Sequence, residues 1–156
     1  MGILLTGADV IDMAIQTEVK GEAFYREAIQ SASTPEAVEL FTYLAEEEAH
    51  HKIIFEIMGS SIVTADQELA EWQEALDYIN ATIEQSLYSD GSAIRSIPEG
   101  ATVAEMIDRA IAFEQETLLF FYTLRDMVQP ANRDLVSRVV AEERLHVRRL
   151  AAMRTR

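Results

Sequence analysis

The sequence predicts an all-α fold, a bundle of four long helices with a long crossover between the second and the third that carries an extra helix. Three observations support this prediction. Apolar residues recur every three to four positions along four long segments, as on one face of a helix. The 156 residues include only six glycines and three prolines, and no stretch shows the sustained alternation typical of strands. The pattern of the first half of the chain also returns in the second half.

The first helix is expected over residues 8–30, with Thr6 suited to cap its N-terminus. The second is expected over 35–58, with its end near Gly59. Thr34 is suited to cap it, and Pro35 fits the first helical position, because proline has no backbone N–H to leave unsatisfied there. Only a few residues join these two helices, which predicts an antiparallel pair.

The third long helix is expected over residues 102–127, where Thr102 and Glu105 form a capping-box pattern. The fourth is expected over 131–154. Between the two pairs, residues 65–85 show one apolar helical face that has no side chain able to bind a metal. We therefore interpret this segment as the crossover helix and expect it to serve packing.

In each long helix a glutamate occupies the middle of the apolar stripe, where the core is expected. Two of these glutamates are followed three positions later by a histidine. The separations between the halves are nearly constant, at 96 positions from Glu18 to Glu114 and 95 positions from Glu48 to Glu143 and from His51 to His146. A duplicated helix pair would bring equivalent side chains to a pseudo-twofold axis. The three-residue spacing places each glutamate and its histidine on one helix face, so both can reach the same ion.

Four carboxylates in one core need a compensating charge, because an ionised carboxylate removed from water without a partner costs several kcal/mol. Lysine and arginine are nearly absent from these stripes near the glutamates. Two divalent cations would balance the charge. Oxygen-rich ligation with one imidazole per metal fits iron or manganese better than zinc or copper. We therefore predict a dinuclear metal site, with two iron ions as the first choice and manganese as the alternative.

A single Glu-x-x-His motif would carry little weight. The chain is rich in glutamate, so the spacing can arise by chance, and Glu47 with His50 also shows it. This pair lies one step around the helix from the stripe and has no counterpart histidine in the second half, so we expect it to lie in solvent. For the other six residues, the duplication and the central positions favour metal binding.

Composition excludes further classes of partner and of functional site. The formal net charge of −14 disfavours nucleic acid and anionic membranes as partners, since both need a basic face. No segment approaches the run of about 20 apolar residues that spans a bilayer. The absence of cysteine excludes disulfides, thiolate metal sites and a thiol nucleophile. We expect residues 1–156 to form a single domain of a cytoplasmic protein.

With these residues in place, the chain resembles the rubrerythrin branch of the ferritin-like diiron-carboxylate superfamily over nearly its whole length. The motifs that carry the resemblance are Phe24-Tyr25 after Glu18 and three longer segments, Leu44-Ala-Glu-Glu-Glu-Ala-His-His51, Phe113-Glu-Gln-Glu-Thr-Leu-Leu-Phe-Phe-Tyr122 and Ala141-Glu-Glu-Arg-Leu-His146. The resemblance implies a ferritin-like bundle in which two irons are bridged by Glu48 and Glu143. It also implies terminal ligands Glu18 and Glu114, and one iron each for His51 and His146.

Two departures from the family pattern matter. Typical rubrerythrins carry a rubredoxin-like domain with a cysteine-bound iron, and this chain has no cysteine, so we expect electrons from an external donor. Their peroxidase site also has an extra glutamate one turn after the ligand of the third helix, where this chain has Thr117. Glu22 is the candidate substitute. Tyr25 and Tyr122 stand where the family places phenols that hydrogen-bond to ligand carboxylates, and the alternative is that both are core aromatic residues.

The leading hypothesis is a diiron oxidoreductase that reduces hydrogen peroxide or dioxygen with electrons from the external donor. A ferroxidase, for which iron is the substrate, is the first alternative, because the same six ligands serve both reactions. The second alternative is a non-catalytic, metal-stabilised helical adaptor. The resemblance also suggests a homodimer or a larger homo-oligomer.

Overall fold

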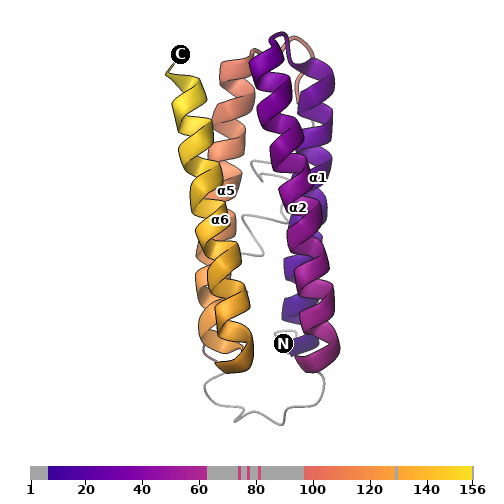
Figure 1. The fold of residues 1–156 in the computed structure, drawn as a ribbon, viewed down its shortest axis with the longest axis vertical. Helices are drawn as coiled ribbons and strands as arrows, with labels where there is room; N and C mark the ends of the chain where they lie inside the picture. Colours follow the sequence, from indigo (N-terminus) through magenta and orange to yellow (C-terminus); the bar gives the residue numbers. More distant parts are fainter. Residues whose placement is uncertain are drawn as a thin grey trace.

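The computed structural model describes residues 7–62, 97–128 and 130–155, together with three isolated positions, 74, 77 and 81. The described chain forms four long helices and no strand (Figure 1), and the helices are α1 (Gly7–Ser31), α2 (Pro35–Ile62), α5 (Val103–Met127) and α6 (Pro130–Arg154). The predicted all-α bundle is confirmed. The crossover helix expected over 65–85 lies outside the described residues.

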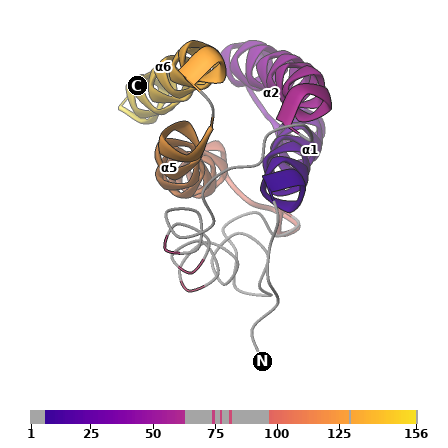
Figure 2. The ribbon, with the colours of Figure 1, turned by 90° about the horizontal axis from the view of Figure 1, so that it is seen from below.

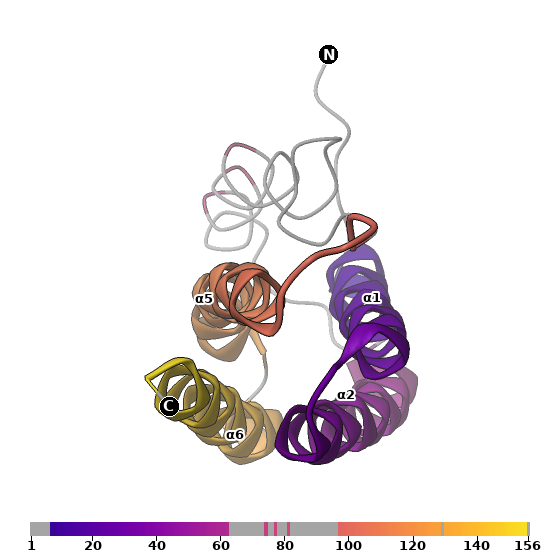
Figure 3. The ribbon, with the colours of Figure 1, turned by 90° about the horizontal axis from the view of Figure 1, so that it is seen from above.

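The four helices form two antiparallel pairs, α1 with α2 and α5 with α6 (Figure 1). The pairs meet where α2 contacts α6 and α1 contacts α5, so that the four helices surround one common axis (Figures 2 and 3). Helix α2 ends at one end of the bundle and α5 begins at the other (Figure 1). This arrangement brings the middle of every helix to the centre of the bundle.

Two helices begin at the predicted capping residues. The backbone N–H of Ala37 donates to Oγ1 of Thr34 over 3.3 Å, and that of Glu105 donates to Oγ1 of Thr102 over 3.2 Å. The carboxylate of Glu105 in turn accepts from the backbone N–H of Thr102 over 2.7 Å, which completes the predicted capping box. Each cap satisfies a backbone donor that the first helical turn leaves without an intrahelical partner.

Helix α2 continues to Ile62, beyond the predicted end at residue 58. Gly59, which suggested a terminus, lies inside the helix. A Cβ at this position would lie 3.0 Å from Cγ2 of Ile11 on α1, so the glycine allows the two helices to approach closely. The predicted end is therefore too early, because a glycine near the end of a helical pattern can mark close packing as well as a helix terminus.

Two apolar clusters fill the bundle, and a buried polar layer lies where they meet. The first cluster draws on all four helices and includes Val10, Phe55, Phe120 and Val139. The second also draws on all four helices and includes Phe24, Phe41, Met106 and Leu150. The polar layer holds the buried glutamates and histidines at the middle of the helices. In the described part of the chain, no helix is both long and apolar enough to cross a membrane.

Candidate metal centre

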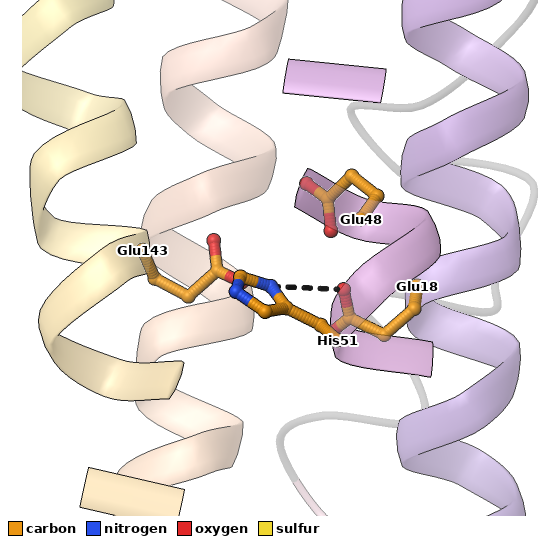
Figure 4. Close-up of side chains that lie close together, drawn as sticks. All are labelled: Glu18, Glu48, His51 and Glu143. Atoms are coloured by element: carbon orange, nitrogen blue, oxygen red, sulfur yellow. Dashed lines mark ion pairs between the residues drawn. The ribbon is translucent and has the colours of Figure 1, made fainter. Parts of the chain in front are cut away.

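The six side chains predicted to bind metal converge at the middle of the bundle. Their origins are α1 for Glu18, α2 for Glu48 and His51, α5 for Glu114, and α6 for Glu143 and His146. All six are buried, with at most 1% of each residue exposed. Figure 4 shows four of them from three helices turned towards one another, namely Glu18, Glu48, His51 and Glu143. The duplicated sequence pattern thus corresponds to one cluster in space.

The ligand atoms of these residues form two overlapping groups of four. One group is Glu18, Glu48, His51 and Glu143, and the other is Glu48, Glu114, Glu143 and His146. Within each group, one ligand atom from every residue lies within 4.8 Å of the others. Glu48 and Glu143 belong to both groups. Two groups that share two carboxylates have the geometry of a dinuclear centre with two bridging ligands.

The two histidines present the same ring nitrogen to the centre. Nδ1 of His51 lies 2.8 Å from Oε1 of Glu143 and 3.6 Å from Oε2 of Glu18. Nδ1 of His146 lies 3.0 Å from Oε2 of Glu143 and 3.5 Å from Oε1 of Glu114. Glu143 therefore stands between the two imidazoles, whose ring centroids are 5.6 Å apart.

Two observations show that the residues fit a pair of metal ions. Both carboxylate oxygens of Glu18 and of Glu48 are buried, and no described residue outside the cluster donates a hydrogen bond to them, which is costly unless a cation binds them. In addition, a Cβ on Gly21 would lie 3.0 Å from Cδ of Glu48 and 3.2 Å from its Oε1. The glycine leaves room for this carboxylate at a helix position where glycine costs about 1 kcal/mol relative to alanine.

Crowding shifts the pKa values of the four carboxyl groups. Burial raises the pKa of Glu18 and of Glu48 well above the ordinary value, and the charges of neighbouring glutamates raise it further. Burial and the charge of Glu143 raise the pKa of Glu114 to about 8. Glu143 differs: burial alone would raise its pKa, but hydrogen bonds from His146 and His51 hold it well below the ordinary value.

The same carboxylates shift the pKa values of the two histidines. Burial alone would lower the pKa of both imidazoles, but the contacts with Glu143 outweigh burial at His51 and raise its pKa to about 10. The contacts with Glu114 and Glu143 likewise raise the pKa of His146 to about 11. Without metal, the centre therefore retains protons on Glu114 and on both imidazoles at neutral pH. Metal binding at these ligands must displace those protons.

Two further contacts orient the predicted ligands from outside the cluster. The hydroxyl of Tyr25 donates a hydrogen bond to Oε1 of Glu114. Nε2 of His51 lies 2.7 Å from Oε2 of Glu142 on α6. The sequence reasoning missed Glu142. A signal was present, because Glu142 stands 95 positions after Glu47, so that Glu-Glu-x-x-His is part of the repeat.

Tyr122 makes no hydrogen bond to a ligand carboxylate in the described structure. It is half-buried, and the guanidinium carbon of Arg125 lies 5.2 Å from its ring centroid. The repeat explains this position. Phe121, not Tyr122, stands 96 positions after Tyr25, so Tyr122 points one step further around α5.

The two positions considered for an extra carboxylate also lie apart from the ligand groups. Glu22 pairs with Arg26 on the same helix at 2.6 Å and belongs to neither group. Thr117 is buried, and its hydroxyl has no hydrogen-bond partner among the described residues. The described centre therefore contains four carboxylates.

His50 and Glu47, the pair expected in solvent, differ from each other. His50 is exposed, as expected, whereas Glu47 is half-buried. Ligand atoms of Glu47, Glu142 and His51 lie within 4.8 Å of one another and form a third group beside the centre. Because Glu47 and Glu142 are both partly exposed, this group connects the buried cluster with the surface of the bundle.

Comparison with known proteins agrees with this geometry. The family model described as Rubrerythrin matches residues 9–154. Among solved structures, a Thermotoga maritima protein described as a candidate ferritin-like diiron-carboxylate protein matches with a TM-score of 0.69. The match covers 99% of this chain and 98% of that chain at 22% sequence identity, which shows a shared fold. No curated protein matched the sequence.

Proposed function

Because the chain belongs to the rubrerythrin family, we propose that it is a non-haem diiron oxidoreductase. In this proposal the protein reduces hydrogen peroxide, or dioxygen, with electrons from an external donor. The observation that carries the proposal is the pair of overlapping ligand groups buried in the bundle. The donor set favours iron, with manganese as the alternative, because it is rich in oxygen and offers one imidazole to each position.

Each proposed ion has its own terminal ligands and shares the two bridging carboxylates. Glu18 and His51 would hold one ion, and we call this the Glu18/His51 position. Glu114 and His146 would hold the other, at the Glu114/His146 position. The carboxylates of Glu48 and Glu143 would bridge both positions. When bound, two ferrous ions supply two electrons and polarise the O–O bond of the oxidant.

The protein itself would position these ligands and exclude water. The two apolar clusters enclose the polar layer, and the low local dielectric strengthens the attraction between carboxylates and cations. Tyr25 keeps its proton directed at Glu114 and thereby fixes the orientation of that carboxylate. Since the sequence holds no cysteine, we propose a reductant outside this sequence.

An anaerobic Fe(II) titration of the metal-free protein tests the proposal. We expect about two tightly bound ions per chain, followed by prompt oxidation when peroxide is added. Glu48→Ala and Glu143→Ala should impair both positions, because each removes a shared ligand. Glu46→Ala and His50→Ala alter exposed neighbours on α2 and should bind iron as the wild type does. Folded wild-type protein that binds no iron tightly would refute the metal centre.

A ferroxidase is the second candidate, and the third group favours it. The carboxylates of Glu47 and Glu142 lie beside the centre and are partly exposed, so they could pass Fe(II) inwards or Fe(III) outwards. Rapid release of oxidised iron, with repeated turnover of added Fe(II), would identify iron as the substrate. Retention of both ions through cycles of peroxide and reductant would identify the peroxidase. Metal binding without either reaction would leave a metal-stabilised adaptor.

We also propose that the protein forms a homodimer or a larger homo-oligomer, in keeping with its family. Sedimentation velocity of the metal-free and iron-loaded protein would measure the assembly. A monomer in both states would refute this part of the proposal without affecting the metal centre.

A further inference from the structure

The six predicted ligands are duplicated, but the contacts that support them from outside are not. His51 directs Nε2 at the carboxylate of Glu142 over 2.7 Å. The Nε2 of His146 is buried and has no hydrogen-bond partner among the described residues. Glu142 itself is 38% exposed, so it reaches the buried imidazole from the surface of the bundle. The two histidines therefore differ in their outer contacts although their inner contacts are alike.

The sequence repeat shows why His146 lacks an equivalent carboxylate. The counterpart of Glu142 in the first half is Glu47, 95 positions earlier. Glu47 lies beside the hydroxyl of Tyr43. The ring of Tyr43 meets the ring of His146 edge-on, with centroids 6.0 Å apart. In the second half, Arg138 stands where the first half has Tyr43, so the arrangement occurs only once.

We propose that Glu142 is a positioning residue that makes the Glu18/His51 position the tighter of the two metal positions. This inference rests on the proposed function, because it requires that the centre binds two ions. An ionised carboxylate can only accept a hydrogen bond, so Nε2 of His51 must carry the hydrogen. Once the ring loses its second proton, the lone pair is therefore left on Nδ1, which faces the centre. A carboxylate behind a ligand histidine fixes its tautomer, holds its ring and makes it a stronger donor.

The contacts of the two terminal carboxylates, Glu18 and Glu114, also favour tighter metal binding at the Glu18/His51 position. Glu114 shares its negative charge with the hydroxyl of Tyr25, which donates a hydrogen bond to it. Among the described residues, none outside the cluster donates a hydrogen bond to Glu18, so the charge of this carboxylate is available to a cation once its proton has left. The Glu18/His51 position thus combines the stronger imidazole with the stronger carboxylate. The Glu114/His146 position combines the weaker imidazole with the weaker carboxylate.

Co(II) titrations, followed by visible absorption, test this inference. Co(II) is the probe because it is stable in air and its absorption reports its coordination. The wild type should bind two ions in two resolved steps. Glu142→Ala should weaken the tighter step roughly 10- to 100-fold, the usual loss when such a support is removed. Glu142→Gln keeps an acceptor oxygen and should recover most of the affinity. Glu46→Gln removes an exposed carboxylate from α2 and should leave both steps within about threefold of wild type, because Glu46 lies outside all three ligand groups.

Two ligand variants assign the effect to one position. In a Glu114→Ala background only the Glu18/His51 position keeps its terminal ligands, and Glu142→Ala should weaken Co(II) binding there by roughly 10- to 100-fold. In a Glu18→Ala background the remaining ion occupies the Glu114/His146 position, and the same change should have less than about a threefold effect. Equal losses in both backgrounds would indicate general disruption and overturn the inference.

The outcomes also separate this inference from the proposed function. If wild-type protein binds two Co(II) ions, and both Glu142→Ala and the double variant Glu47→Gln/Glu142→Ala bind them with unchanged affinities, only the role of Glu142 is overturned. If Glu47 replaces the lost carboxylate, the double variant Glu47→Gln/Glu142→Ala should show the loss, and wild-type affinities in that variant would overturn the inference. If folded wild-type protein binds neither Co(II) nor Fe(II), both the inference and the metal centre are refuted.

Discussion

Replacing Gly21 with alanine should separate metal affinity from the stability of the fold. The added Cβ would lie 3.0 Å from Cδ of Glu48 and 3.1 Å from Cε1 of Phe113. Carbon atoms in favourable contact are about 3.5–4.0 Å apart, so a neighbour must move by several tenths of an ångström. Phe113 is enclosed in the core and is only 2% exposed. We therefore expect the carboxylate of Glu48 to move.

The two expected effects differ in size. Alanine is favoured over glycine inside a helix by about 1 kcal/mol, and slight overpacking costs roughly 1–3 kcal/mol. The free energy of unfolding of the metal-free protein should therefore fall by less than about 2 kcal/mol. Metal-to-ligand distances tolerate only about 0.2 Å of error. Because Glu48 belongs to both ligand groups, both ions should bind at least about tenfold more weakly, which corresponds to about 1.4 kcal/mol each.

Thermal unfolding of the metal-free protein and anaerobic Fe(II) titration measure the two effects. Gly59→Ala is the matched control, since its Cβ would lie 3.0 Å from Ile11 and meets no atom of the centre. The control should lower stability by a similar amount and leave iron affinity within about threefold of the wild type. If Gly21→Ala binds both ions with wild-type affinity, the space beside Glu48 does not explain the glycine, and the reasoning fails.

Four further results are expected. Acidifying the metal-free protein from pH 9 to pH 5 should raise its unfolding temperature, because the pKa of Glu114 is about 8 when folded and near 4.5 when unfolded, so the folded state takes up the proton first. His51 and His146, with folded pKa values of about 10 and 11, also stabilise the fold as the pH falls towards about 6.5, the value for an unfolded histidine. A melting temperature that falls steadily on acidification would contradict this expectation. Tyr25→Phe should lower the unfolding free energy of the metal-free protein by about 1–2 kcal/mol, measured by urea denaturation, because Glu114 loses its donor. Thr102→Ala should cost about 1 kcal/mol by removing a helix cap while iron binding is unchanged. Iron at about a thousand times its dissociation constant should add roughly 4 kcal/mol of stability per position, and unchanged melting would show that no ion binds the native centre.

The helices and the six clustered residues followed from the sequence because both depend on local spacing. Apolar residues at helical intervals define the buried face of each helix, and a glutamate in that face is necessarily carried into the core. The capping box of Thr102 and Glu105 is equally local, since its partners are three residues apart. The repeat then related the two halves without any knowledge of how the helices pack.

The features that were missed depend on contacts between helices. The contact of Glu142 with His51 joins α6 to α2, and no spacing along one helix reveals it. Tyr122 does not repeat the contact of Tyr25 with a carboxylate, because one residue turns a side chain by about 100° around a helix. Gly59 appeared to be a terminus, although its role is set by Ile11 on the neighbouring helix. Such contacts require the relative positions of the helices, which the repeat pattern alone does not supply.

Each apolar cluster contains buried residues from all four helices, and this has a consequence for folding. Neither the α1–α2 hairpin nor the α5–α6 hairpin can bury its apolar face alone, so the two should gain their structure together in one cooperative transition. Between the clusters, the buried layer of glutamates and histidines is the least stable part of the metal-free bundle, because burying ionisable groups is costly. Backbone amides near Glu48 and Glu143 should therefore exchange hydrogen faster than those near Phe41 and Val139, and bound metal should slow them most. The two ends of the bundle would then stay folded while the middle opens to admit ions and closes around them.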